Sequence, residues 1–170
     1  RARGHQHKLW RDHDLGLDLS SVAEFCLGAA IRSTATAADL LGEPGLWGVT
    51  EWGPAPQLAL ADEVQLLVSR DGLLDGFLEW FDLGFVDGIS LTNRPGERDL
   101  VYGRCCFTLS TPIPVSRGDR IRLRLHLHPT ATPELWTWAG VVHDASGVQK
   151  ARFSDSTFKR SAITLERPAG

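Results

Sequence analysis

The sequence has no methionine and few cysteines. A chain that begins at Arg1 without methionine is expected to be a piece of a longer polypeptide, so its function is expected to be shared with another part. Three cysteines exclude a framework of fully paired disulfides. Cys105 and Cys106, as neighbours on a strand, are interpreted as small apolar fillers, and this cysteine usage favours a cytoplasmic location.

The chain also lacks a strong charge and a long apolar run. Its net charge of −3 over 170 residues gives no indication of a nucleic-acid partner. No apolar stretch approaches the ~18 residues of a membrane-spanning helix, so no membrane partner is expected. The length fits one domain or a small pair, at ~100–200 residues per domain, and a hydrophobic fraction of 42% is enough for a core.

Common catalytic and cofactor-binding motifs are missing as well. The sequence has no Ser-His-Asp arrangement, no GxSxG elbow, no CxxC pair and no Gly-rich phosphate loop. Its glycines are expected in turns, without a strand–GxG–helix unit around them. These residues therefore indicate no cofactor site of their own.

Residues 1–14 are polar, and we interpret them as a linker that leads into one domain at 15–170. The linker contains three histidines in a flexible, basic context: His5, His7 and His13. This context favours solvated side chains over a metal site.

Residues 20–31 have the pattern of a helix with two apolar sides. Ser21 and Glu24 form a capping-box pair. Two stripes follow at helical spacing: Val22, Phe25, Cys26, Ala29 and Ala30 on one side, and Ala23, Leu27 and Ile31 on the other. Such a helix is either deeply buried in a core or forms a subunit contact. A short second helix is expected from Thr36 to Leu41, before Gly42.

From Leu46 onward the pattern is that of β-strands. Strands are expected at 46–52, 64–69, 77–85, 101–109, 120–128, 135–143 and 148–153, with turn signals between them. Many short strands without intervening helices are typical of an antiparallel sandwich or barrel. The predicted fold is therefore mainly β, an antiparallel β-barrel or sandwich with a short helical segment near the N-terminus.

One acidic residue stands out in the strand expected at 77–85. Glu79 would share a face with Phe77 and Phe81, where a carboxylate is costly unless it is paired or reaches water. Two interpretations are open. Glu79 pairs with an arginine such as Arg104 at the sheet margin, or it lies beside aromatic walls that receive a cationic group. The candidate walls are Trp80, Tyr102 and Trp136.

The strongest metal-like signal is His126 and His128, followed by Glu134 and His143. This order resembles the ligand set of cupin-like metalloenzymes. Strand alternation argues against such a site, because it places four apolar residues on the inner face: Ile121, Leu123, Leu125 and Leu127. Both histidines then lie outside with Arg120, Arg122 and Arg124, and we interpret this face as solvated, with no metal bound.

Three runs of the sequence resemble the C-terminal half of protein arginine methyltransferases and related bacterial enzymes. These runs are GLDLSSVAEFC (16–26), LLVSRDGLLDGFLEWFDLGF (66–85) and VYGRCCFTLSTPIPVSRGDRIRLRL (101–125). The matching positions are Trp10, Gly16-Leu17-Asp18, Gly76-Phe77, Trp80-Phe81-Asp82-Leu83-Gly84-Phe85 and 115–121. The resemblance spans roughly residues 10–160.

The resemblance implies a β-barrel domain for substrate binding and dimerisation in a methyltransferase that uses S-adenosylmethionine. A separate Rossmann domain, in the same chain or in a partner, would bind that cofactor. A homodimer contact is implied through an arm at about residues 18–41, carried by Val22, Phe25, Cys26, Leu27 and Ile31. The implied substrate contacts are Glu79, Trp80, Asp82, Tyr102 and Arg104. No residue of this chain is expected to be catalytic or to bind the cofactor.

The sequence departs from the family beside the expected active site. Leu100-Val101-Tyr102 occupies the place of the Thr-His-Trp loop, and Val101 stands at the histidine position. The tail RFSDSTFKRSAITLE (152–166) is closer to bacterial members with small-molecule or unassigned substrates. The methyl acceptor therefore stays open between protein arginine, another protein residue and a small molecule. The alternative functions are a non-catalytic β-sandwich binding module and a cupin-like metalloenzyme.

Overall fold

The computed structural model of the chain describes residues 28–54, 57–60, 63–98, 100–128 and 135–157. Within these ranges the protein consists of antiparallel strands and two 3-10 turns, which confirms the predicted mainly β class. None of the described elements is a helix long and apolar enough to cross a membrane. The chain divides into a first unit of Arg1–Leu40 and Asp75–Pro112, and a second unit of Leu41–Leu74 and Ile113–Gly170.

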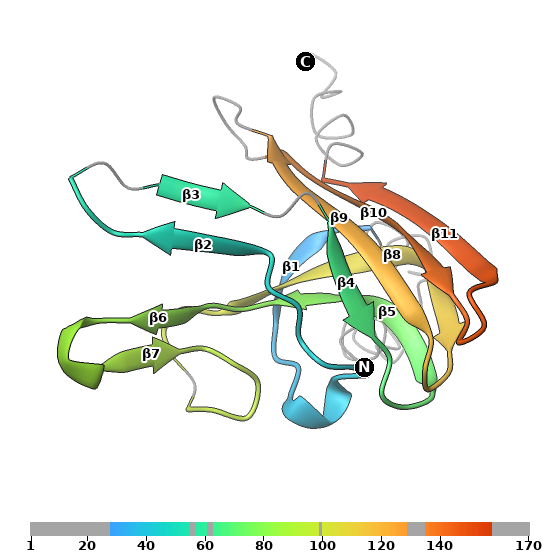
Figure 1. Cartoon of the computed structure of the whole chain (residues 1–170), viewed down its shortest axis with the longest axis horizontal. Coiled ribbons are helices and arrows are strands. Elements are labelled where there is room, and N and C mark those ends of the chain that lie inside the picture. Colours follow the sequence, from blue (N-terminus) through green and yellow to red (C-terminus); the bar gives the residue numbers. More distant parts are fainter. Residues whose placement is uncertain (1–27, 55–56, 61–62, 99, 129–134, 158–170) are drawn as a thin grey trace, which may run out of the picture. The chain divides into compact units, whose positions relative to one another are not determined.

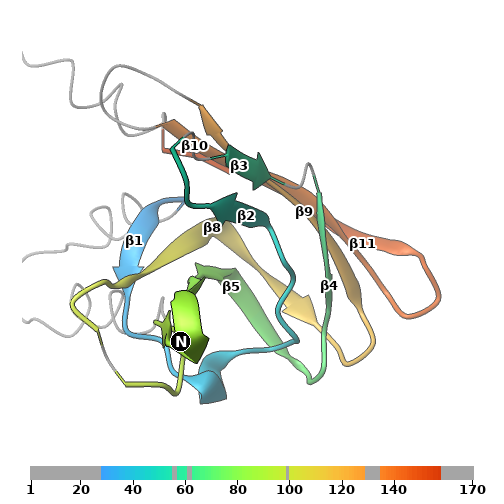
Figure 2. The same cartoon turned by 60° about the vertical axis from the view of Figure 1, so that its left-hand side comes forward.

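A three-stranded sheet in the order β1-β8-β5 organises the first unit (Figure 2). Its strands are β1 (Ala30–Ser33), β8 (Arg104–Val115) and β5 (Gly72–Glu79), and the last two also contribute residues to the second unit. β1 pairs antiparallel with β8, with Ala30 opposite Phe107 and Ser33 opposite Arg104.

Gly76 permits β5 and β8 to approach each other closely. A β carbon at this position would lie 2.8 Å from the carbonyl oxygen of Phe107 and 3.1 Å from the sulfur of Cys106. A side chain would therefore force the two strands apart. The buried apolar residues of this unit are Ala29, Phe77, Cys106, Phe107 and Leu109.

The first unit also contains a two-stranded hairpin of β6 (Asp82–Gly84) and β7 (Ser90–Thr92). The 3-10 turn η2 (Val86–Gly88) connects the two strands, and Figure 1 shows the hairpin following directly on β5. The prediction of one strand over 77–85 is therefore wrong, because β5 ends at Glu79. The partner changes at this point: Phe81 exchanges hydrogen bonds with Asn93, which follows β7.

A four-stranded antiparallel sheet in the order β11-β10-β9-β4 forms most of the second unit (Figure 1). Its strands are β4 (Val64–Leu67), β9 (Arg120–His128), β10 (Leu135–His143) and β11 (Gln149–Ser156). A further antiparallel pair consists of β2 (Gly48–Glu51) and β3 (Gln57–Leu60).

The core of the second unit is centred on Trp138, which is fully buried. On β9, Ile121, Leu123 and Leu125 are buried between exposed arginines, and this confirms the predicted alternation. Gly140 leaves room for an aromatic ring, since a β carbon there would lie 2.5 Å from Phe153. The alternation of this sheet thus separates an apolar inner face from a basic outer face.

The predicted strand bounds agree with the observed ones in two long strands and differ in others. The bounds of β9 and β10 are as predicted. β8 begins at Arg104 and continues to Val115 through Pro112 and Pro114, whereas the prediction ended at Leu109. β1, β3 and β7 were not predicted, because runs of three or four residues carry little periodicity.

Both predicted helices need correction within the described residues. Ala30 and Ile31, expected at the end of a helix, lie in β1, where Ile31 pairs with Cys106; the β-branched Ile31 suits a strand. Residues 20–27 lie outside the described ranges. The second predicted helix, 36–41, is only the 3-10 turn η1 (Ala37–Asp39), because the backbone is already extended at Leu40, with φ −69° and ψ 133°.

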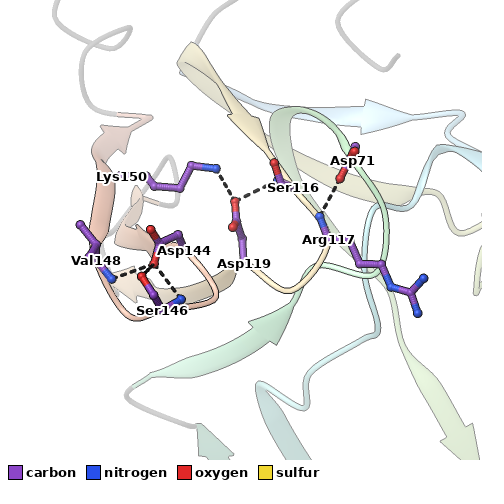
Figure 3. Close-up of polar contacts among 8 residues, drawn as sticks. All are labelled: Asp71, Ser116, Arg117, Asp119, Asp144, Ser146, Val148 and Lys150. Carbon is purple, nitrogen blue, oxygen red and sulfur yellow. Dashed lines mark hydrogen bonds and ion pairs between the residues drawn. The ribbon is translucent and has the colours of Figure 1, made fainter.

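Asp119 is a buried carboxylate that fixes the turn between β8 and β9 (Figure 3). Its Oδ2 accepts a hydrogen bond of 2.9 Å from the N–H of Ser116 and lies 2.6 Å from Nζ of Lys150 on β11. Because the Asp119 side chain is only 3% exposed, the ammonium group supplies charge compensation that water cannot give.

Asp144 organises the turn between β10 and β11 in a similar way (Figure 3). Its Oδ1 accepts hydrogen bonds from the Ser146 hydroxyl at 2.6 Å and from the N–H of Val148 at 2.9 Å. These bonds, with that of the Ser146 hydroxyl largest, hold the pKa of the Asp144 carboxyl below its ordinary value. Gly147, with φ at 92°, closes the turn in the left-handed region.

We expect Lys150→Met to lower the free energy of unfolding by about 3 kcal/mol, because it leaves the Asp119 carboxylate buried without its cation. Asp119→Asn should cost less, since the amide oxygen still accepts from Ser116 and carries no charge. Urea denaturation measures both changes, with Lys150→Arg as the charge-preserving control. A smaller loss for Lys150→Met than for Asp119→Asn would contradict this role of the ion pair.

Candidate functional site

The five residues predicted as substrate contacts all lie in the first unit. Three of them contact the segment Asn93-Arg94: Trp80 and Asp82 contact the Arg94 side chain, and Arg104 binds the main chain. Tyr102 instead contacts Phe81, whose backbone bonds to Asn93. The fifth, Glu79, ends β5 beside Trp80. The segment after β7 therefore connects most of the candidate site.

Asn93 holds this site together. Its side chain is almost fully buried; Oδ1 accepts a hydrogen bond of 2.8 Å from the N–H of Phe81, and Nδ2 donates one of 2.9 Å to the carbonyl of Gly103. The backbone N–H of Asn93 donates to the carbonyl of Phe81 at 3.3 Å. One amide thus ties the end of β5 to the start of β8. Asn93 was not among the predicted site residues, and its signal in the sequence is an Asn-Arg-Pro turn (93–95).

Arg94 directs its guanidinium at two of the predicted contacts. Its Nη2 lies 3.7 Å from Oδ2 of Asp82, and its central carbon lies 5.9 Å from the centroid of the Trp80 ring. Oδ1 of Asp82 lies 2.5 Å from the hydroxyl oxygen of Thr92, which donates the hydrogen bond. The Arg94 and Asp82 side chains are 50% and 60% exposed, so water screens this ion pair.

Arg104 has a structural role in the site. Its Nη1 donates to the carbonyl oxygens of Asn93 at 3.2 Å and Arg94 at 3.3 Å. The contacts described for Arg104 are with main-chain oxygens, and the Glu79–Arg104 pair stays a prediction. Arg104 positions the backbone that carries Arg94.

Glu79 and its neighbour Cys105 lie in a partly dehydrated environment. Burial raises the pKa of the Glu79 carboxyl above its ordinary value. Burial, and then the charge of Glu79, raise the pKa of the Cys105 thiol to about 11. The pKa of Cys106 is raised to about 12, by burial first and by Asp75 second. Both thiols are free and protonated at neutral pH, as expected of apolar fillers.

Tyr102 and Val101 lie in the loop before β8. The prediction of a strand that begins at Val101 is therefore wrong at these two residues. Tyr102 is 62% exposed, and its ring meets Phe81 edge-on at 6.1 Å. The carbonyl of Val101 accepts a hydrogen bond of 3.0 Å from Nη2 of Arg32. Trp136, the third aromatic wall proposed for a pocket, belongs to the second unit, where it packs 5.7 Å from Trp47.

The histidine residues of β9 lie on its exposed face. The rings of His126 and His128 are 6.2 Å apart, and Nε2 of His128 lies 3.0 Å from the hydroxyl of Thr137. Glu134 and the linker histidines His5, His7 and His13 lie outside the described ranges. Among the described residues, no group of three or more His, Cys, Asp or Glu side chains is placed to hold a metal ion.

The predicted dimer arm is only partly described. Val22, Phe25, Cys26 and Leu27 lie outside the described ranges, whereas Ile31 is a half-buried residue of β1. The structure therefore places Ile31 in the sheet of the first unit.

Comparisons with known proteins find structural similarity alone. No family model matches the sequence, and no curated protein matches it. Among solved structures, the crystal structure of protein arginine methyltransferase 10 from Arabidopsis thaliana is similar, with a TM-score of 0.59 and 20% sequence identity. The match covers 91% of this chain and 52% of that chain, so this chain spans about half the length of that enzyme.

We expect Asn93→Ala to destabilise the protein by about 3 kcal/mol, because it leaves the Phe81 N–H and the Gly103 carbonyl without their partner. Asn93→Asp should cost at least as much at pH 7, because it places a buried carboxylate against the Gly103 carbonyl oxygen. Arg94→Ala, on the neighbouring exposed side chain, is the control and should cost less than ~1 kcal/mol. Equal losses for Asn93→Ala and Arg94→Ala in urea denaturation would show that Asn93 does not hold the site.

Glu79→Gln should stabilise the protein at pH 7, and the gain should disappear in acid. Burial raises the folded-state pKa of the Glu79 carboxyl above its unfolded-state pKa. Below the unfolded-state pKa the carboxyl is protonated in both states, so it does not lower the free energy of unfolding there. Stability is then lost as the pH rises through the folded-state pKa. Urea denaturation between pH 4 and pH 7 measures the effect, with Glu97→Gln as an exposed control of the same charge change. A gain independent of pH would refute the burial argument.

Proposed function

We propose that this chain is the substrate-binding and dimerisation domain of an S-adenosylmethionine-dependent methyltransferase. The observation that carries the proposal is the structural match of 91% of the chain to 52% of an arginine methyltransferase chain. The order of the WFDLGF segment (80–85) and the region 115–121 supports the same assignment. Because nearly half of the similar enzyme has no counterpart in this match, a cofactor-binding domain would be supplied in the same polypeptide or by a partner.

The described residues do not fit S-adenosylmethionine as a ligand. A class I cofactor site lies at the carboxyl edge of a parallel sheet, with a glycine-rich turn that opens a helix. The described sheets are antiparallel, and the described glycines with positive φ lie outside any strand–turn–helix unit. We therefore assign cofactor binding and methyl donation to the missing domain, and substrate positioning to this chain.

Positioning is the contribution that a methyltransferase requires of such a domain. Transfer from a sulfonium needs the acceptor atom in line with the methyl group, so correct placement accounts for much of the rate. In the proposed site, Trp80 and Tyr102 provide aromatic surface, Asp82 and Glu79 provide carboxyl groups, and Arg104 fixes the backbone between them. These groups suit an acceptor that carries a positive charge.

Three classes of methyl acceptor remain open for the proposed enzyme. Val101 at the expected histidine position removes a side chain that arginine methyltransferases place beside the acceptor, and Val101 is 85% exposed. An arginine side chain, another protein residue and a small cationic molecule each remain compatible with the carboxyl and aromatic groups.

We propose a homodimer through the arm that contains Val22, Phe25, Cys26, Leu27 and Ile31, in the cytoplasm.

Calorimetry with S-adenosylmethionine tests this division of labour. The 170-residue chain should bind no cofactor and transfer no methyl group, whereas the complete polypeptide, or the chain with its cofactor-binding partner, should bind it with micromolar Kd. Incubation with tritiated cofactor and arginine-rich protein, lysine-rich protein or small-molecule extracts then identifies the acceptor class. Micromolar binding of the cofactor to the isolated chain would overturn the proposal.

A pair of matched tryptophan variants then tests the proposed substrate contacts in the active protein. Trp80→Ala should raise KM for the acceptor about tenfold without changing the Kd of the cofactor. Trp52→Ala removes another tryptophan, which is 75% exposed and belongs to the second unit, and should leave both constants unchanged.

A further inference from the structure

A row of arginines runs along the outer face of the four-stranded sheet in the second unit. On β9, Arg120, Arg122 and Arg124 are exposed, and they alternate with the buried Ile121 and Leu123. We propose that this row is a docking surface for an acidic segment of a partner protein, bound in extended form with carboxylates at alternate positions. The inference concerns binding alone and does not depend on methyl transfer or on any cofactor.

The outer face of this sheet presents positive charge without negative charge. The register places Arg152 of β11 and Arg122 of β9 on the two sides of Val141, so a fourth arginine joins the row across β10 (Figure 1). The sequences of β4, β9, β10 and β11 contain one carboxylate residue, Asp155, and it is buried opposite Trp138. The charged side chains that these four strands expose are therefore all basic.

The composition of the whole chain does not account for this separation of charge. The chain has 21 acidic residues against 18 Lys and Arg residues, with a net charge of −3. Side chains of both signs would solvate a sheet face equally well and would avoid repulsion between neighbours. A surface of one sign raises the local concentration of ligands of the opposite sign and accelerates their association. The arginine row therefore suits an anionic ligand.

A carboxylate of the chain itself already contacts one end of this row. Oε2 of Glu63, the residue before β4, lies 3.5 Å from Nε of Arg124, whose side chain is 65% exposed. Among the described residues, neither Arg120 nor Arg122 forms an ion pair with a carboxylate. An external acidic segment would repeat the Glu63 contact at these two positions.

The spacing of the arginines selects an extended ligand. Alternate residues of a strand lie about 6.6–6.8 Å apart along its axis, because each residue advances by about 3.3–3.4 Å. An extended peptide with Glu or Asp at every second position has the same repeat. Its carboxylates can therefore meet Arg120, Arg122 and Arg124 in register, each through the planar fork of a guanidinium group. In a helix, acidic residues two positions apart point to different sides and would not face the row.

Nucleic acid suits this face less well than an acidic peptide. Proteins bind single-stranded nucleic acids through aromatic stacking as well as through charge. Trp136, Trp138 and Phe153 are the Trp and Phe residues of the four strands, and the register places all three at inward positions. The residues of β10 opposite Arg122 and Arg124 are Val141 and Ala139, which offer no stacking surface.

The test is a titration of a short fluorescent peptide of alternating Glu and Ser with the 170-residue chain, followed by anisotropy at low ionic strength. Arg122→Gln should raise the Kd about two- to fivefold, because one exposed ion pair is lost. Arg98→Gln is the matched control, since it removes an exposed arginine of the first unit, and it should leave the Kd unchanged. Glu63→Gln should lower the Kd by a similar factor, because it frees Arg124 and removes a competing carboxylate.

Two further ligands distinguish the proposed surface from general charge attraction. A peptide of the same composition with its Glu residues in one block should bind about threefold more weakly than the alternating peptide, because its carboxylates do not match the row. A single-stranded oligonucleotide of the same charge should also bind more weakly.

Equal Kd values for the two peptides, tighter binding of the oligonucleotide, or equal effects of Arg122→Gln and Arg98→Gln would refute the proposal. Should Arg122→Gln fail to fold, Glu63→Gln decides the question. An unchanged or higher Kd in that variant would overturn the proposal.

Discussion

The first unit depends on one buried amide. At the end of β5 the backbone of Phe81 would need a strand partner, and Asn93 supplies it with its side-chain oxygen at 2.8 Å and its own N–H at 3.3 Å. The same side chain donates to Gly103, immediately before β8 begins. Burial of an amide whose donor and acceptor are both hydrogen-bonded costs little free energy of folding. An unpaired backbone N–H or carbonyl group at this depth would destabilise the fold. The strand therefore ends where the amide replaces it.

The end of β5 at this point explains why the acidic residue Glu79 lies in a segment that looks apolar. The sequence of 77–85 looks apolar on both faces because two strands with different partners were taken as one. Phe77 is buried in the sheet with β8, whereas Phe85, beyond β6, is 55% exposed. Glu79 lies at the last position of β5, where burial is incomplete and raises the pKa of its carboxyl without excluding it from the fold. The alternation of side chains between two faces can be read only along a strand that keeps the same neighbouring strand.

Local patterns predict strands from the sequence, whereas roles that arise from contacts between distant residues cannot be predicted from it. Local alternation located β9 and β10, because Ile121, Leu123 and Leu125 repeat with a period of two. The resemblance to arginine methyltransferases, and not alternation, indicated Trp80, Asp82 and Tyr102 as candidates. Asn93 and Arg94 were missed because their roles arise from contacts with Phe81, Gly103 and Asp82, which no local pattern encodes. Ala30 and Ile31, which lie in β1, were assigned to the end of a helix because small and aliphatic residues fit both periods.

In the candidate site, hydrogen bonds hold the main chain, whereas the Arg94 side chain contacts groups that are exposed to solvent. Asn93, Arg104 and Thr92 fix the main chain through short hydrogen bonds, while the guanidinium of Arg94 rests on groups that remain half exposed. The two sets of interactions use different atoms, so loss of the exposed Arg94–Asp82 ion pair would leave the main-chain hydrogen bonds in place. A fully buried Arg94–Asp82 pair would cost more to break, because its loss would leave a charge without solvent. The exposed Arg94–Asp82 pair therefore contributes little to the stability of the first unit, which depends on the main-chain hydrogen bonds.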